Sequence, residues 1–334
     1  MATLHSEEEV ARRLADAKTL PDAGQPSSDN PQETAVAGPE RPKRFALTST
    51  VVDSLVGFIS NPTERWYMGF PEFDLATRGV GRGEVMMILG RSHTGKSQIL
   101  LNSIVWNLVN HHDAHAVIFS LDEPRELVLM KLFCLLKGRS SEQVEEAIKQ
   151  GDKDTLSDLE RAATQELSRV AIVDEAIHLD EMERVMDEAR AWWGVEPSFA
   201  MIDYLELLPG GDADSVGVTS KAQAVKRWAK TQRVPVGLVH QSGRGTSPPG
   251  HAAGLYGGRY GGEHEAIFVL EVYRKKDRTD LSMWEQEYHA NSINMNLCKN
   301  KRTARLLDQT YYLDPVAGHV HPYHEELIPE TRDR

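Results

Sequence analysis

The chain has 334 residues, 40% of them hydrophobic, and a formal net charge of −12 at pH 7. It is long enough to bury one large core, its acidity argues against nucleic-acid binding over the whole surface, and no apolar run approaches the roughly 20 residues that span a bilayer. The two cysteines, Cys134 and Cys298, lie in apolar stretches and are expected to be reduced. These features predict a cytoplasmic protein with no membrane partner.

The first 65 residues differ in composition from the rest. Residues 1–44 are poor in large apolar side chains and rich in Pro, Ser, Asp and Gln, which predicts a disordered arm with one short helix over Ser6–Ala17. Residues 45–65 contain Val51–Ile59, whose apolar spacing predicts a linker helix that packs on a neighbouring subunit. Residues 66–334 are expected to form one domain.

Within this domain, short apolar runs alternate with amphipathic segments, which predicts an α/β fold with a mostly parallel sheet covered by helices on both faces. The expected strands are Glu84–Leu89, Ala116–Ser120, Val170–Val173, Phe199–Asp203, Val236–His240 and Ala266–Leu270. The expected helices are Lys96–Val109, Pro124–Leu136, Ser141–Gln150, Leu179–Trp193 and Ser220–Gln232, with Trp192 and Trp193 as packing residues. Ile293–Lys299 and Arg305–Leu313 predict a C-terminal β-hairpin.

A phosphate-binding loop (P-loop) follows the first of these strands. Gly90–Ser97 fits the pattern G-x-x-x-x-G-K-[ST], in which glycines let backbone N–H groups surround phosphates. Lys96 can reach the terminal phosphates and the Ser97 hydroxyl can hold Mg²⁺. The sequence therefore predicts ATP and Mg²⁺ as ligands. The predicted nucleotide-binding residues are Gly90, Arg91, Ser92, His93, Thr94, Gly95, Lys96, Ser97 and Gln98.

Two further strands end in carboxylates. Asp203 closes a buried strand and is the predicted second magnesium residue, beside Ser97. Tyr204 follows it, so a base for hydrolysis has to come from elsewhere. Asp122 and Glu123 come directly after Ala116–Ser120 and can activate water, Glu123 by reach and Asp122 by alignment. A helix start at this position is the alternative interpretation.

The basic side chains concentrate in the last third of the domain. Between Lys221 and Arg305 they outnumber acidic ones, whereas acidic residues dominate between Ser120 and Ser215. Gln241 ends a strand and is a candidate γ-phosphate sensor. The Gly-rich segment 242–262 then favours contact with single-stranded DNA over a passive loop. Its candidate DNA-binding residues are Arg244, Tyr256, Arg259 and Tyr260.

A last group of cations lies at the predicted hairpin. Lys299, Lys301 and Arg302 surround its tip, where cations can complete the ATP site of a neighbouring subunit, as arginine fingers do in trans. An ordinary solvated basic turn is the alternative.

From about Trp66 to His319, these motifs in this order resemble the C-terminal motor domain of DnaB-like replicative helicases, within the RecA-like ATPases. The similar segments are the lead-in Gly69–Val80, Phe119–Asp122 (family F-S-L-E), Ile202–Leu207 (I-D-Y-L-Q-L), Gln241–Arg244 (Q-L-N-R) and Lys299–Lys301 (K-N-R). The resemblance implies a RecA-like P-loop core. It further implies a catalytic base at Asp122, a sensor at Gln241, and contacts from Lys299 and Lys301 to the γ-phosphate of the neighbour.

Three departures from the family pattern matter. Aspartate stands at the base position with Glu123 next to it, lysine stands at the finger position with Arg302 next to it, and the family's DNA-binding segment is replaced by the Gly-rich Gly254–Arg259. The family's bacterial members also carry an N-terminal domain that contacts primase. A motor preceded only by a short arm resembles the smaller helicases of some bacteriophages, which act in the host cytoplasm.

The resemblance implies an ATP-hydrolysing ring, a hexamer, that translocates on single-stranded DNA and unwinds duplex in replication. Partners of such a motor include a primase, a polymerase or a loader. Two alternatives stay open at this point. One is a recombinase or strand-annealing ATPase with the same core. The other is a scaffold or loader that uses ATP only as a switch.

Overall fold

The computed structural model describes residues 48–60, 64–210, 215–243, 247–255 and 261–322. Contacts divide the chain into two units, residues 1–48 and 49–334, and the fold below is that of the second unit. The arm predicted over residues 1–44, with its helix at Ser6–Ala17, lies outside the described residues.

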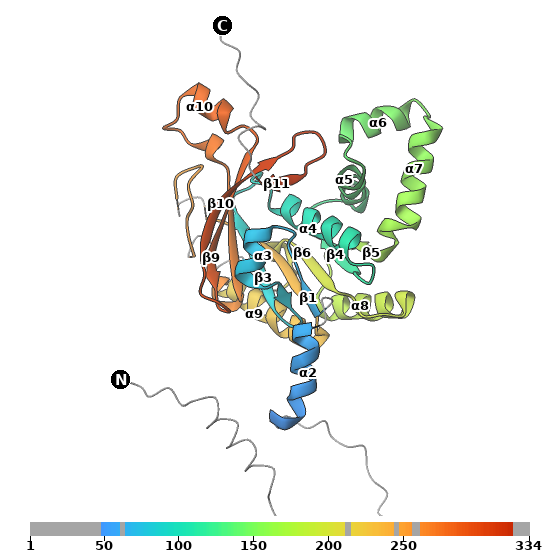
Figure 1. Ribbon diagram of the computed structural model, residues 1–334, viewed down its shortest axis with the longest axis vertical. Helices are drawn as coiled ribbons and strands as arrows, with labels where there is room; N and C mark the ends of the chain where they lie inside the picture. Colours follow the sequence, from blue (N-terminus) through green and yellow to red (C-terminus); the bar gives the residue numbers. More distant parts are fainter. Residues whose placement is uncertain (1–47, 61–63, 211–214, 244–246, 256–260, 323–334) are drawn as a thin grey trace, which may run out of the picture. The chain divides into compact units, whose positions relative to one another are not determined.

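Among the described residues, one nine-stranded sheet has the order β11-β10-β9-β8-β3-β7-β6-β4-β5 (Figure 1). The strands from β8 to β5 are parallel, and β9, β10 and β11 extend the sheet with antiparallel pairs. This confirms the predicted mostly parallel sheet and the C-terminal hairpin. The strands are β3 Val85–Gly90, β4 Ala116–Ser120, β5 Val170–Val173, β6 Phe199–Asp203, β7 Val236–Gln241, β8 Phe268–Tyr273, β9 Ser292–Asn300, β10 Leu307–Leu313 and β11 Val320–Pro322. A separate pair joins β1 Arg65–Trp66 to β2 Val80–Gly81.

Helices cover both faces of this sheet because its strands alternate between two cores. On β3, Met86 and Ile88 pack with α4 and α5, whereas Met87 and Leu89 pack with α8 and α9. Such alternation on a parallel strand buries both faces. The described helices are α2 Thr48–Ser60, α3 Pro71–Thr77, α4 Lys96–Asn110, α5 Arg125–Lys137, α6 Ser141–Lys149, α7 Lys153–Thr164, α8 Leu179–Trp193, α9 Ser215–Gln232 and α10 Met283–Tyr288.

Several expected boundaries were wrong. Helix α9 begins at Ser215 rather than Ser220, and β8 runs over Phe268–Tyr273 rather than Ala266–Leu270. The polar helix α7 was missed because few of its side chains are buried. Trp192, expected to pack, is 86% exposed, because it lies on the solvent face of α8.

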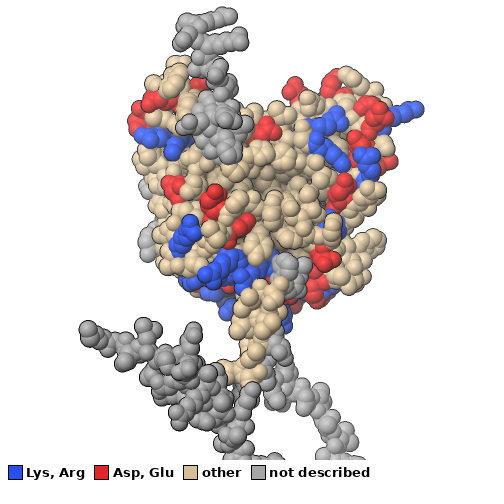
Figure 2. All heavy atoms as spheres, viewed as in Figure 1, with Lys and Arg blue, Asp and Glu red and all other residues tan. Residues whose placement is uncertain are grey.

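The outer elements leave the sheet in two directions. In Figure 1, α6 and α7 stand beyond α5, while α10 lies at the other side, beyond β9 and β10. Figure 2 shows charged side chains of both signs around the rim of this face and few in its middle. No helix in the described part of the chain is long and apolar enough to cross a membrane.

Trp66 ties three elements together. Its ring stacks on Phe199 of β6 with centroids 4.4 Å apart, and its Nε1 donates a hydrogen bond to Ser103 Oγ of α4 at 3.0 Å. The side chain is 1% exposed. Trp66 thus fixes the lead-in segment to both β6 and α4.

We expect Trp66→Ala to destabilise the domain by about 3–5 kcal/mol, because it leaves a large cavity and removes the hydrogen bond to Ser103 Oγ. Urea unfolding measures this change. The matched control is Trp192→Ala, expected within about 0.5 kcal/mol of wild type, because that ring is in solvent. Equal losses in the two variants would contradict this account of the core.

Candidate nucleotide site

The P-loop connects the end of β3 to the start of α4, and its glycines are required by close contacts. A Cβ on Gly90 would lie 2.5 Å from Val272 O and 2.8 Å from Thr94 Oγ1. Gly95 has φ +98°, a backbone angle that residues other than glycine rarely adopt, and a Cβ there would lie 2.9 Å from Ile293. Only glycine at both positions leaves room for this loop conformation. The backbone N–H groups at the start of α4 can then bind phosphates.

Lys96 is buried within this loop. Its side chain is 8% exposed and its Nζ donates a hydrogen bond to Arg91 O at 2.7 Å. Burial lowers the pKa of Lys96, and the negative charges of Asp203, Glu206 and Asp122, in that order, act to raise it. A lysine at this place in the loop is suited to bind the phosphates of a nucleotide.

Asp203 and Ser97 meet beside Lys96. Asp203 is 6% exposed and pairs in register with Ser120 of β4, and it accepts a hydrogen bond from Ser97. Burial raises the pKa of Asp203 to about 6, although the Ser97 hydrogen bond and the Lys96 charge act to lower it. A cation would relieve this burial cost, because it favours the ionised carboxylate.

These two residues fit the magnesium ion of a P-loop nucleotide site. No cluster of three or more His, Cys, Asp or Glu side chains in the described part of the chain could hold a metal ion by itself. Ser97 and Asp203 would supply protein oxygens, and Mg²⁺ usually takes the remaining ones from water and substrate phosphates.

The two candidate bases differ in their surroundings. Glu123 is bound by the Lys131 ammonium through both carboxylate oxygens, and its backbone oxygen accepts from Ser120 Oγ at 2.7 Å. Asp122 is exposed, and its charge acts on both Lys96 and Asp203. Both acids thus lie at the same edge as the P-loop, as the strand order predicts.

Gln241 lies at the same edge. It pairs in register with Gly90, and its neighbour Ser242 donates a backbone hydrogen bond to Gly90 O at 3.0 Å. The backbone N–H of Gln241 is held by Glu206 Oε1 at 3.0 Å. The end of β7 is therefore joined both to the P-loop strand and to the segment after Asp203.

The segment after Gln241 is only partly described. Arg91 reaches Ser247 O at 3.5 Å, and the backbone N–H groups of Ala253 and Gly254 are bound by the Glu271 carboxylate, which is 2% exposed. The four candidate DNA-binding residues lie outside the described residues; they are Arg244, Tyr256, Arg259 and Tyr260.

The hairpin cations lie at the opposite edge of the sheet, because β9 runs antiparallel to β8. Lys299 Nζ donates to Glu263 O and His264 O, and Lys301 Nζ donates to His264 O. Burial and the positive charges of Lys301 and Lys226 lower the pKa of Lys299 to about 8. The structure therefore does not bring these cations to the P-loop of their own chain.

Arg302 has a different environment from the two lysines. Its guanidinium donates to Thr77 O and Gly79 O and forms an ion pair with Glu84. The side chain is 16% exposed. These contacts hold the hairpin against the start of β3.

Sequence reasoning missed three residues of this region: Glu206, Lys131 and Glu271. Glu206 lies within the motif Ile202–Leu207, but its contact with β7 depends on the fold. Glu271 carries a local signal, because it is a lone carboxylate inside the apolar strand Phe268–Tyr273. Such a group has to find buried partners.

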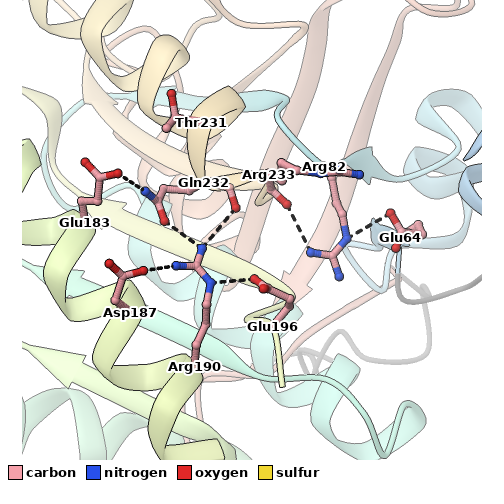
Figure 3. A pocket seen from close by; sticks show the side chains of 9 residues that line it. All are labelled: Glu64, Arg82, Glu183, Asp187, Arg190, Glu196, Thr231, Gln232 and Arg233. Carbon is pink, nitrogen blue, oxygen red and sulfur yellow. Dashed lines mark hydrogen bonds and ion pairs between the residues drawn. The ribbon is translucent and has the colours of Figure 1, made fainter. Parts of the chain in front are cut away.

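A pocket of about 610 Å³ lies at the other edge of the sheet, near the amino ends of β3, β6 and β7. Figure 3 shows Arg190 between Asp187, Glu196 and Gln232. Arg82 is turned to Glu64 in the same view. The charged side chains of this pocket thus pair largely with one another, which indicates a structural role.

We expect Asp203→Asn to abolish ATP turnover and to stabilise the nucleotide-free protein at pH 8. The folded-state pKa of about 6 lies above the usual 3.8, so ionising Asp203 costs stability as pH rises from about 4 through 6. Asparagine removes that cost, roughly 1–3 kcal/mol at 1.36 kcal/mol per pKa unit.

Urea unfolding without Mg²⁺ at pH 4 and pH 8 measures this difference, which should fall to about 0.5 kcal/mol at the lower pH. The surface variant Asp277→Asn serves as control and should stay within about 0.5 kcal/mol of wild type at both. A loss of stability in Asp203→Asn at pH 8 would show that burial is not the dominant influence on this carboxylate.

Comparison with known proteins agrees with this geometry. The profile of the DnaB-like helicase C terminal domain family matches residues 67–249. The replicative DNA helicase DnaB of Nostoc sp. is 27% identical over 183 residues, which cover 53% of this chain and 20% of that protein. That of Leifsonia xyli subsp. xyli is 27% identical over 186 residues, covering 53% and 39%. The chain thus spans less than two fifths of the length of either relative.

Solved structures share the fold. A DnaB-like replicative helicase, described with its interactions with primase, superposes with a TM-score of 0.67 at 17% identity, over 84% of this chain and 68% of that one. A KaiC-like protein from Pyrococcus horikoshii superposes with a TM-score of 0.51 at 15% identity, over 79% of this chain and 100% of that one. These likenesses confirm the predicted RecA-like core, and with the family match over more than half of the sequence the chain belongs to the DnaB-like helicase C terminal domain family.

Proposed function

We propose that the protein is an ATP-hydrolysing motor that assembles as a hexameric ring and unwinds duplex DNA while moving along a single strand. One observation carries the proposal. The P-loop, Asp203 and Gln241 gather at one edge of the sheet, whereas Lys299 and Lys301 lie at the opposite edge. In such an arrangement Lys299 and Lys301 can contact an ATP site on a neighbouring copy rather than the one on their own chain.

Each residue of the gathered edge has a role in this proposal. Lys96 binds the terminal phosphates, while Ser97 and Asp203 hold Mg²⁺, which neutralises phosphate charge when bound. Asp122 is the better candidate for orienting the attacking water, because Glu123 is engaged by Lys131. Gln241 senses the γ-phosphate from the end of β7.

Lys299 and Lys301 are the proposed trans-acting cations. Their ammonium groups contact backbone oxygens of Glu263 and His264, which a phosphate of the neighbouring site can replace. Arg302 is the weaker candidate, because leaving its ion pair would remove the positive charge beside the partly buried Glu84 carboxylate.

Helix α2 supports assembly into a ring. Its apolar side chains Val52, Leu55, Val56 and Ile59 are all more than half exposed. An apolar stripe of this size on a surface helix favours burial against another surface. We propose that α2 packs on the adjacent subunit.

The contact with single-stranded DNA is assigned to the segment after Gln241, including Arg244, Tyr256, Arg259 and Tyr260. The described part of this segment is held by Glu271 of β8, next to the strand that leads into the P-loop. A primase, polymerase or loader as partner, a cytoplasmic location and kinship with bacteriophage helicases stay predictions.

The test is steady-state ATP turnover, with and without single-stranded DNA, for Lys96→Ala, Lys301→Ala and a mixture of the two. Each variant alone should lose about 10²-fold or more in kcat, because each removes a charge that stabilises the transition state. The mixture should recover part of the activity, since some interfaces then pair an intact P-loop with an intact Lys301.

The control is Lys276→Ala, an exposed lysine on the short segment Lys275–Asp277, which should stay within about twofold of wild type. No recovery on mixing would contradict a site shared between subunits. Tight ATP binding by the wild type without turnover would instead support the scaffold or loader.

A further inference from the structure

Glu206 lies between the two parts of the nucleotide site that have to respond to the γ-phosphate. Its carboxylate oxygen Oε1 accepts the backbone N–H of Gln241 at 3.0 Å. Its negative charge raises the pKa of Lys96, less than the charge of Asp203 does and more than that of Asp122. This acid thus touches the sensor strand and lies within electrostatic range of the phosphate-binding lysine.

The backbone of Glu206 is held in place from two sides. It belongs to a 3₁₀ turn, Leu205–Leu207, whose Leu205 side chain is fully buried in the core under α8 and α9. Its carbonyl oxygen accepts a hydrogen bond from Lys221 Nζ of α9 at 3.0 Å. The carboxylate therefore extends from a fixed point, which a side chain that positions another element needs.

The surroundings restrict the carboxylate further. The Glu206 side chain is 13% exposed, and His240 Nδ1 lies 3.0 Å from Oε1. His240 is fully buried, and Glu206 Oε1 is the acidic oxygen that its Nδ1 contacts. The Oε2 atom of Glu206 is buried without a hydrogen-bond partner among the described residues. Both of these contacts of Oε1, with His240 Nδ1 and with the Gln241 N–H, are thus made to the end of β7.

We propose that Glu206 is a positioning residue, whose carboxylate fixes the end of β7 so that the Gln241 side chain starts from a defined point beside the P-loop. The inference rests on the proposed function for Gln241. Without this hold, the end of β7 stays joined to the P-loop strand through β-pairing and the Ser242 N–H. Gln241 would then reach the γ-phosphate less often in the productive geometry.

Three substitutions separate the hydrogen bond from the charge. Glu206→Ala removes both, Glu206→Gln keeps an acceptor oxygen at the same reach without charge, and Glu206→Asp keeps the charge but falls one methylene short. Positioning predicts that the glutamine variant behaves like wild type and the aspartate variant behaves like alanine. If the alanine variant does not fold, the comparison of glutamine with aspartate still carries the test.

The first readout is amide hydrogen exchange at Gln241 in the nucleotide-free full chain, which does not depend on ATP turnover. Exchange should be about 10-fold faster or more in the alanine and aspartate variants and within about threefold of wild type in the glutamine variant. Unchanged exchange in all three would overturn the proposed hold.

The second readout is ATP turnover with DNA. The alanine and aspartate variants should lower kcat by about 10- to 100-fold with KM within about threefold, because misplacing a group affects chemistry more than binding. Loss of kcat in the glutamine variant as large as in alanine would overturn the proposal in favour of a charge effect. A wild type that binds ATP without turnover would instead contradict the proposed function and leave the exchange result intact.

The control for both readouts is Glu183→Ala. Glu183 also holds a polar group, Gln232 Nε2 at 2.9 Å, but it lies in the pocket at the opposite edge of the sheet (Figure 3). The Glu183→Ala variant should keep both the exchange rate of the Gln241 amide and kcat within about twofold of wild type. An effect of Glu183→Ala as large as that of Glu206→Ala would mean that general loosening causes both.

Discussion

The parallel pairing of β3 with β7 and β8 is the constraint on which the nucleotide site depends. In this register Gly90 lies opposite Gln241 on one side and Val272 on the other, so the P-loop leaves the sheet between two fixed strand ends. Because the carboxyl ends of parallel strands share one edge, Asp203 of β6 arrives at the same place. The site is thus a product of strand order, and each strand contributes one or two side chains.

Without a nucleotide, the charged forms of Lys96 and Asp203 at this edge reduce the stability of the fold. The same burial lowers the pKa of Lys96 and raises that of Asp203, so each charge is disfavoured although the two attract one another. Phosphates with Mg²⁺ would satisfy both groups, since they bring the opposite charge to each. Shifted pKa values of this kind are common at functional sites.

Much of the fold could be predicted because local pattern and long-range structure agree. The strands Ala116–Ser120 and Phe199–Asp203 have the predicted bounds, since buried strands read as continuous apolar runs. Helix α7 and the exposed Trp192 could not be predicted, because both depend on which face of a helix meets the rest of the protein. The partners of Glu206 and Arg302 could not be predicted either, since each contacts residues that are distant in the sequence.

The central claim is that ATP turnover at this edge drives movement along DNA, and strand displacement tests it most directly. A forked duplex with one labelled strand should be separated by the wild type with ATP and Mg²⁺, and left intact with a non-hydrolysable analogue or by Lys96→Ala. Turnover that is stimulated by single-stranded DNA but never separates the fork, or that anneals complementary strands instead, would contradict the account and support a recombinase.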